Sequence, residues 1–378
     1  MKLTTAGESH GRALVAIIEG LPAHLKIDQE KINDALALRQ SGYGRGARQK
    51  IERDRVEILT GVRNEETLGS PVTLCIFNKD FANWENCMSA GACDEEAMQA
   101  KRLTKVRPGH ADLTGMVKFA QVDARNILER ASARETAIRV AAGEVYRQYL
   151  ESLGVEICGY VKEICGIKDE GRYAFNDLKR AKTTETGMLD EQAERLAKEK
   201  IAALKKDGDT AGGVVEIRVK GLKSGFGSMM TYGEKLDARL AGALMSIQAV
   251  KGVEVGDGFA VGSRSGRFVH DEIFYQEDKG FYRETNRAGG IEGGMSNGEE
   301  LILRLVMKPI PTLMKGLRTA DFIEKQAATA ASERSDVCAI FALERIAESV
   351  IAEVLARVVD ERLGGDTMEQ VKTRYEAL

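Results

Sequence analysis

Short hydrophobic runs recur along the chain, and many of their residues are β-branched. Five of these runs are bounded on both sides by residues that favour turns, a pattern typical of β-strands. They predict strands at residues 13–19, 56–61, 71–77, 213–219 and 300–306.

Other segments repeat their hydrophobic residues at the period of an α-helix. One such segment predicts a helix over 134–153 that Gly154 ends, and a second helix is expected over 189–206, where heavy charge indicates a surface position. The apolar stripe of the first helix consists of Ile138, Ala141, Ala142, Val145, Tyr149 and Leu153.

A third helix is predicted over 336–363. Ser335 is expected to be its N-cap, because a serine hydroxyl can accept a hydrogen bond from a free N–H of the first turn. Gly364 and Gly365 follow the last periodic residue and predict its end.

The order of these elements indicates the fold class. Strands and helices do not alternate regularly, so the sequence does not support a doubly wound parallel sheet. No internal repeat or low-complexity linker divides the chain. We therefore predict a single α+β domain over 1–378.

The composition is that of an ordinary globular protein, with 43% hydrophobic and 30% charged residues. No apolar run approaches the ~18 residues of a membrane span, and the start lacks a signal-peptide pattern, so a cytoplasmic protein without membrane contact is expected. The six cysteines form no C-x-x-C and no zinc-like cluster, so no metal site is expected. A net charge of −3 disfavours bulk binding of nucleic acid.

The string GESHG at 7–11 fits G-x-S-x-G, the nucleophile elbow of serine hydrolases. An elbow lies between a strand and a helix and needs an oxyanion loop placed before it in the chain. Only 1–6 precede Gly7, which disfavours a nucleophilic Ser9. Because His24, His110 and His270 follow Ser9 in the chain, the number of histidines does not exclude a Ser-His-acid catalytic triad.

The segment 39–50 places Arg39, Arg45, Arg48 and Lys50 among three glycines. Three interpretations remain open for it. It could be a solvated loop, an Arg/Gly-rich arm for nucleic acid, or a mobile loop whose guanidinium groups close over a small polyanion.

Three further segments combine arginine with serine, histidine or aspartate at a turn or at an expected helix start. They contain Arg107 and His110 in a turn, Arg130, Ser132 and Arg134 at the start of the helix near 134, and Arg334, Ser335 and Asp336 at the start of the helix near 336. Helix starts favour anions. Four such clusters in a chain without excess positive charge indicate one site for a highly anionic ligand. The glycine-rich segments 223–235 and 286–298 do not fit a dinucleotide fingerprint.

Long motifs of this chain resemble those of the chorismate synthases, and they follow that family's order over nearly the whole length. They read GESHG with EGLP, RPGHAD, ERASARETAIRVAAGEV, MSIQAVKGVEVGDG, NRAGGIEGGMSNGE, KPIPT and ERSDV. The resemblance implies a lyase that eliminates phosphate from 5-enolpyruvylshikimate-3-phosphate (EPSP) in an anti-1,4 sense to give chorismate, the last common step of the shikimate pathway.

The resemblance also implies reduced FMN as cofactor, a β-α-β sandwich with helices between antiparallel sheets, and a homotetramer. It leaves open whether NADPH reduces the flavin on this protein or a separate flavin reductase supplies it.

The resemblance assigns three catalytic residues. His10 is expected beside the flavin, placed to protonate or hydrogen-bond the reduced ring. His110 is expected to protonate the departing phosphate. Asp336 is expected near flavin N5, in the relay that removes the ring proton.

The same resemblance assigns the binding residues. Substrate contacts fall on Ser9, Arg39, Arg45, Arg48, Arg107, Arg134 and Arg334, and NADPH contacts on Arg39 and Arg45. Flavin contacts fall on Arg130, Ala131, Ser132, Gln248, Ala249, Gly293, Lys308, Pro309, Ile310, Pro311, Thr312 and Arg334. This chain departs from many members at Ala131, where they have Ser, and at Gln248, where they have Asn, which affects individual flavin hydrogen bonds.

Overall fold

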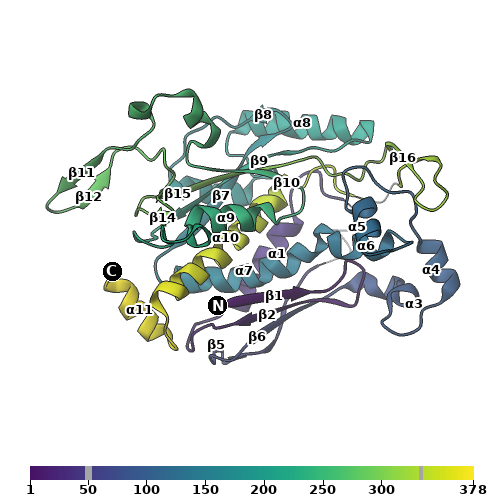
Figure 1. Ribbon diagram of the computed structural model, residues 1–378, viewed down its shortest axis with the longest axis horizontal. Coiled ribbons are helices and arrows are strands. Elements are labelled where there is room, and N and C mark those ends of the chain that lie inside the picture. The colour runs from purple at the N-terminus through teal and green to yellow at the C-terminus, as the bar shows by residue number, and fades with distance from the viewer. Residues whose placement is uncertain (47–52, 332–334) are drawn as a thin grey trace.

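Two antiparallel sheets form the outer layers of the fold, and helices fill the space between them (Figure 1). The computed structural model describes residues 1–46, 53–331 and 335–378. The first sheet has the order β1 (Lys2–Ala6), β2 (Ala13–Glu19), β6 (Val72–Phe77) and β3 (Glu57–Thr60). The second has the order β10 (Val250–Val255), β15 (Leu301–Met307), β9 (Gly213–Lys220), β7 (Glu156–Ile164) and β8 (Ile167–Lys168). The expected α+β sandwich is confirmed.

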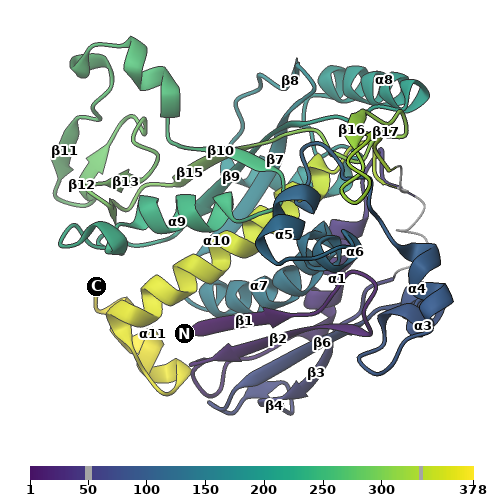
Figure 2. The same ribbon diagram turned by 45° about the vertical axis from the view of Figure 1, so that its right-hand side comes forward.

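The central layer consists of α1 (Gln29–Gln40), α7 (Thr136–Glu151) and α10 (Ile340–Leu363), which lie between the sheets in both views (Figures 1 and 2). Because α10 touches other elements on all sides, almost every residue of its first four turns is buried, charged ones included. α7 and α10 approach so closely that a Cβ added to Gly143 would come within 2.3 Å of Ser349 Cβ. Glycine at this position permits the helix crossing.

Shorter elements surround these three layers, and β11 and β12 project away from them (Figure 2). The remaining strands are β4 (Val62–Arg63), β5 (Glu66–Thr67), β11 (Ile273–Gln276), β12 (Gly280–Arg283), β13 (Ile291–Glu292), β14 (Met295–Ser296), β16 (Arg318–Ala320) and β17 (Ala327–Thr329). The remaining α-helices are α3 (Glu85–Met88), α4 (Glu95–Lys101), α5 (Asp112–Lys118), α6 (Arg125–Ala131), α8 (Glu191–Asp207), α9 (Leu236–Met245) and α11 (Met368–Glu376). The 3-10 helices are η1 (Lys79–Asn83), η2 (Ala133–Glu135), η3 (Phe175–Thr183), η4 (Tyr232–Glu234), η5 (Gly258–Ser263) and η6 (Gly266–Phe268).

The five predicted strands are confirmed as β2, β3, β6, β9 and β15, each within one residue at either end. The predicted surface helix is confirmed as α8, whose buried residues Ala193, Ala197 and Ile201 form one stripe. Asp169 fixes the chain just before α8. The buried carboxylate of Asp169 accepts hydrogen bonds from the backbone N–H groups of Leu189 and Asp190.

The predicted start of the last long helix is wrong. α10 begins at Ile340, and its N-cap is Ala339 rather than Ser335. Ser335 Oγ instead donates to the carbonyl oxygen of Thr312, and the Val337 N–H donates to the carbonyl oxygen of Gly44. These long-range contacts hold 335–339 outside the helix, so Asp336 does not lie in a helical first turn.

The start of α7 also differs from the prediction. Ser132 caps the short helix η2 by accepting a hydrogen bond from the Arg134 N–H, and α7 starts only at Thr136. Arg134 therefore lies in a 3-10 turn, and Arg130 lies in the last turn of α6. Arg39 lies in the last turn of α1 and is buried, so it does not belong to a mobile loop.

None of the helices in the described ranges is both long and apolar enough to cross a bilayer.

Glu144 in α7 generates a prediction about stability. The pKa of its carboxyl is raised to about 7, mainly by burial. The charges of Glu151 and Glu348 also raise this pKa, whereas those of Arg147 and Lys182 lower it. Below about pH 7 the neutral carboxyl is therefore favoured in the folded protein. Its contribution to stability is complete below pH 4.5, the unfolded value, and is lost as pH rises through 7.

Glu144→Gln, which cannot ionise, is expected to escape this loss. Its free energy of unfolding should exceed that of the wild type at pH 8.5 by up to about 3 kcal/mol, and the gap should shrink at pH 5. Urea unfolding followed by circular dichroism at both pH values measures it. Exposed Glu199→Gln is the control. A gap of equal size at both pH values would refute the prediction.

Candidate active site

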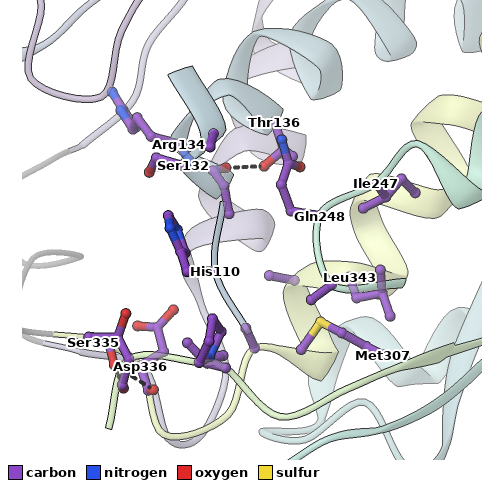
Figure 3. Close-up of a pocket in the computed structure, with 18 of the residues that line it drawn as sticks. His110, Ser132, Arg134, Thr136, Ile247, Gln248, Met307, Ser335, Asp336 and Leu343 are labelled. Atoms are coloured by element: carbon purple, nitrogen blue, oxygen red, sulfur yellow. Dashed lines mark hydrogen bonds between the residues drawn. The ribbon is translucent and has the colours of Figure 1, made fainter. Parts of the chain in front are cut away.

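A cavity of about 440 Å³ lies where α7, α10 and the segment before β10 meet, within the size range of small-molecule sites. Figure 3 shows His110, Arg134, Gln248 and Asp336 around it, with Leu343 and Met307 on its apolar side. The structure brings together most residues assigned from the sequence: Ser9, His10, Arg39, Arg45, Arg107, His110, Ala131, Ser132, Arg134, Gln248, Ala249, Lys308, Ile310, Pro311, Thr312 and Asp336.

His10 lies in the turn that joins β1 to β2, which are antiparallel neighbours. Its ring nitrogen Nδ1 lies 2.8 Å from Glu129 Oε1, and its backbone N–H donates to Glu129 Oε2 at 2.7 Å. Ser9 is buried beside it and receives a hydrogen bond from Ser132 Oγ. Because GESHG joins strand to strand rather than strand to helix, the nucleophile elbow is excluded.

His110 lies in the turn before α5 and shares a carboxylate with Arg107. Asp112 Oδ1 lies 2.5 Å from His110 Nδ1, and Arg107 Nε donates to Asp112 Oδ2 at 2.8 Å. Burial opposes ionisation of Asp112, yet hydrogen bonds from His110 and Arg107 outweigh it and hold its pKa well below the usual range. Asp112 is therefore ionised and can stabilise a positive charge on His110.

Arg39 and Arg134 share a second buried carboxylate. Arg134 Nη1 donates to Asp54 Oδ2 at 2.6 Å, and Arg39 Nη1 lies 3.9 Å from the same oxygen. Arg134 also donates from Nε and Nη2 to Asn78 Oδ1. Arg39 also donates to Thr136 Oγ1 at 3.0 Å. Both guanidinium groups are thus fixed in the cavity wall by internal partners.

Arg45 pairs with Asp336 across the cavity rim, with 2.9 Å between Arg45 Nη1 and Asp336 Oδ2. The Gly46 N–H donates to Asp336 Oδ1 at 2.6 Å. Within the described ranges Arg45 Nε has no hydrogen-bond acceptor, although it is buried. The assigned residues Arg48 and Arg334 lie outside the described residues.

Gln248 lines the cavity and has a buried acceptor in its side chain. Its amide nitrogen donates to Glu135 Oε1 at 2.9 Å, and its oxygen Oε1 is buried without a donor among the described residues. Since a carboxylate accepts hydrogen bonds, Glu135 fixes the orientation of this amide. The cavity therefore has a vacant acceptor that suits a ligand N–H.

Lys308 lies at the end of β15, and its Nζ donates to the carbonyl oxygen of Gly109. Burial, together with the nearby charge of Lys251, lowers the pKa of Lys308. Lys251 also lines the cavity, which places two lysines with the arginines around one space.

Three assigned flavin contacts do not line the cavity: Arg130, Pro309 and Gly293. Arg130 is half-exposed and donates to the carbonyl oxygen of Gly7. Gly293 lies in the turn between β13 and β14. Their roles as flavin contacts stay predictions.

The carboxylates behind the cavity wall were not predicted from the sequence. Glu129, Glu135 and Asp112 belong to the quoted motifs ERASARETA and RPGHAD, where their spacing to the assigned residues could have indicated them. Asp54 and Asn78 lie in no such motif, and only the fold brings them to Arg134. No group of three or more His, Cys, Asp or Glu in the described part of the chain could hold a metal ion.

The shared carboxylate of Asp54 generates a prediction. Asp54→Asn leaves the buried cations Arg39 and Arg134 without their anion, and breaking such a pair costs about 3–5 kcal/mol of stability. Chemical unfolding measures this loss. The exposed Asp34→Asn on α1 is the control and should change stability by less than about 0.5 kcal/mol. Equal stability of the two variants would contradict the pairing.

Comparison with known proteins shows the family of this chain. A family model described as "Chorismate synthase" matches residues 1–359. The chorismate synthase of Alkaliphilus metalliredigens is 50% identical, covering 100% of this chain and 98% of its own length. That of Geobacter metallireducens is 51% identical with the same coverage. A crystal structure of chorismate synthase superposes with a TM-score of 0.79 at 37% identity, over 100% of this chain and 96% of that one. The chain belongs to the chorismate synthase family.

Proposed function

We propose that this cavity converts EPSP to chorismate by anti-1,4-elimination of phosphate, with reduced FMN bound beside the substrate. The observation that carries the proposal is the set of cations around one partly apolar space: Arg39, Arg45, Arg107, Arg134, Lys251 and Lys308, together with His10 and His110. EPSP has one phosphate and two carboxylates, and FMN adds a phosphate, so both ligands require such a set.

The residues present fit a flavin. Gln248 Oε1 is a buried acceptor without a donor among the described residues, as an isoalloxazine N–H requires. Ile247, Met307 and Leu343 supply apolar surface for the ring. We propose that Gln248, Ala249, Ala131, Ser132 and the segment 308–312 hold it. When bound there, reduced flavin would supply electron density that assists the loss of phosphate.

The protein's own groups handle the charge and the protons. The reaction breaks a C–O bond to phosphate and a C–H bond at opposite ends of an allylic system. We propose that His110 donates a proton to the departing phosphate, a role that its pairing with the ionised Asp112 supports. We propose that Asp336, held by Arg45 and by the Gly46 N–H, accepts the proton of the C–H bond.

Arginines that are fixed before the substrate binds can hold its anionic groups in one orientation. Arg107 and Arg134 each use several of their donors on internal partners, so their planes cannot rotate freely. The rival interpretation of 39–50 as a nucleic-acid arm is disfavoured for its described arginines, because the side chains of Arg39 and Arg45 are only 6% and 9% exposed.

The family supports three further proposals: a homotetramer, a cytoplasmic location, and reduction of FMN either by NADPH at Arg39 and Arg45 or by a separate flavin reductase.

The two cavity histidines generate a prediction. His10→Ala and His110→Ala should each slow the release of phosphate from EPSP by about 10² to 10⁴, the usual contribution of a positioned acid or base. His24 and His270 do not line the cavity, so alanine there should leave turnover unchanged. Anaerobic turnover with photoreduced FMN is the measurement, and wild-type turnover of a cavity variant would remove that histidine from the mechanism.

The flavin generates a second prediction. Chorismate should form only with reduced FMN, with many turnovers for each flavin and no net oxidation of it, because the overall reaction has no redox change. Photoreduced FMN, excess EPSP and anaerobic recording of both chorismate and the flavin spectrum test this. Equal turnover with oxidised FMN, or one flavin oxidised for each chorismate, would contradict the proposal.

A further inference from the structure

Glu129 makes three contacts to the turn that contains His10. Its carbonyl oxygen accepts from the Ser9 N–H at 2.8 Å, its Oε2 from the His10 N–H at 2.7 Å, and its Oε1 lies 2.8 Å from His10 Nδ1. Glu129 is 3% exposed and does not line the cavity, whereas His10 does. Its carboxylate can therefore act on a ligand through His10, which it contacts and which lines the cavity.

The other side of His10 is fixed by Trp84. The two rings stack with their centroids 4.0 Å apart and 27° between their planes. The Trp84 Nε1–H donates to Asp80 Oδ2 at 3.2 Å, which holds the indole in turn. His10 is thus fixed in the plane of its ring by Glu129 and across its face by Trp84.

The contacts to Glu129 also fix the tautomer of His10. An ionised carboxylate only accepts hydrogen bonds, so the ring nitrogen that faces Glu129 must have the proton. In neutral His10 this nitrogen is Nδ1, and the bare nitrogen is Nε2. When Nε2 takes up a proton, the imidazolium that forms is already paired with a carboxylate.

We propose that Glu129 is a positioning residue that keeps His10 protonated on Nδ1 and makes Nε2 the reacting nitrogen. The proposal deepens the proposed function, on which its catalytic part rests. Among the described residues, the charged groups around the pair include Arg125 of α6, whose Nη1 lies 3.7 Å from Glu129 Oε1 and whose guanidinium also lies over the Trp84 ring. Lys101 of α4 lies over the same ring, and Asp80 accepts a hydrogen bond from the Trp84 Nε1–H. The carboxylate of Glu129 is the one in direct contact with the ring.

Glu129→Gln tests the tautomer because it exchanges one acceptor for a donor at nearly the same shape. Two donors of His10, the backbone N–H and Nδ1–H, face this side chain. A glutamine has one oxygen for them. If its oxygen faces the backbone N–H, its amide nitrogen faces Nδ1 and favours the Nε2–H tautomer. If it is reversed, a buried backbone N–H loses its partner.

Activity gives the first measurement. Glu129→Gln should lower turnover at least about tenfold, with little change in the KM for EPSP. The turnover of Glu129→Gln should not fall below the turnover of His10→Ala. In a His10→Ala background it should have no further effect, because the two residues act as one unit. Glu129→Asp, which keeps both acceptor oxygens, should retain more turnover than Glu129→Gln. An equal loss in both backgrounds would assign Glu129 a merely structural role and overturn the proposal.

Fluorescence gives a measurement that needs neither flavin nor EPSP. Trp84 is the chain's one tryptophan and stacks on His10, and an imidazolium quenches indole emission more than a neutral imidazole does. Acidification should therefore produce a quenching transition in the wild type that His10→Phe abolishes. Glu129→Gln should move it to lower pH, because the ring loses an adjacent opposite charge, and Glu129→Asp should move it less. An unmoved transition would overturn the proposal even if chorismate forms.

The wild type supplies a test that does not depend on whether a variant folds. Nitrogen NMR of ¹⁵N-histidine-labelled protein, with the His10 signals assigned by their loss in His10→Ala, reports which ring nitrogen has the proton. A protonated Nδ1 and a bare Nε2 are expected in neutral His10. The opposite tautomer would overturn the proposal. Failure of the protein to form chorismate, with the expected tautomer, would overturn the proposed function alone.

Discussion

A charge removed from water needs a partner, and this requirement governs how the cavity is built. Most of the cations and histidines that line it lie beside a carboxylate, which some of them share: Glu129 for His10, Asp112 for His110 and Arg107, Asp54 for Arg134 and Arg39, and Asp336 for Arg45. Three of these carboxylates lie behind the wall, and Asp336 alone lines the cavity itself. The inner surface can therefore be cationic although the whole chain has a net charge of −3.

The sandwich brings these pairs to one place. The end of α1, the junction of α6 with α7, the segment before α10 and the β1–β2 turn all reach the same end of the central helix layer. Their members are far apart in sequence, as Gly46 and Asp336 show. Because antiparallel sheets cover the helices from both sides, the paired charges lie in a region of low dielectric, where each pairing is stronger than in water. The site consequently depends on the packing of α7 against α10.

The sequence predicted the elements whose signals are local. The strands β2 and β15 follow from β-branched runs, and the end of α10 follows from Gly364. The start of α10 was mispredicted because contacts of 335–339 with Gly44 and Thr312 override the helical pattern. Most charged groups that line the cavity were predicted because they occur in the family motifs or in the segment 39–50, whereas Lys251 was not assigned. The partners Asp54 and Asn78 were not, because an acid or amide in a loop has no local signal for the arginine that the fold places beside it.

The carboxylates that hold the arginines of the cavity wall affect the entropy cost of binding an anion. A flexible surface arginine loses side-chain entropy when it grips a phosphate, and that loss weakens affinity. Arg107 and Arg134 lose this freedom on folding, because Asp112 and Asp54 already hold them. The cost is thus met by the stability of the sandwich, and the ligand meets donors that are oriented in advance. The same logic explains why the partners are carboxylates rather than neutral acceptors. Asp54 shows the effect: burial lowers the pKa of Arg39 to about 9, and the charge of Asp54 opposes that loss of charge. A cavity built in this way can bind several anionic groups together and still fold when none is present.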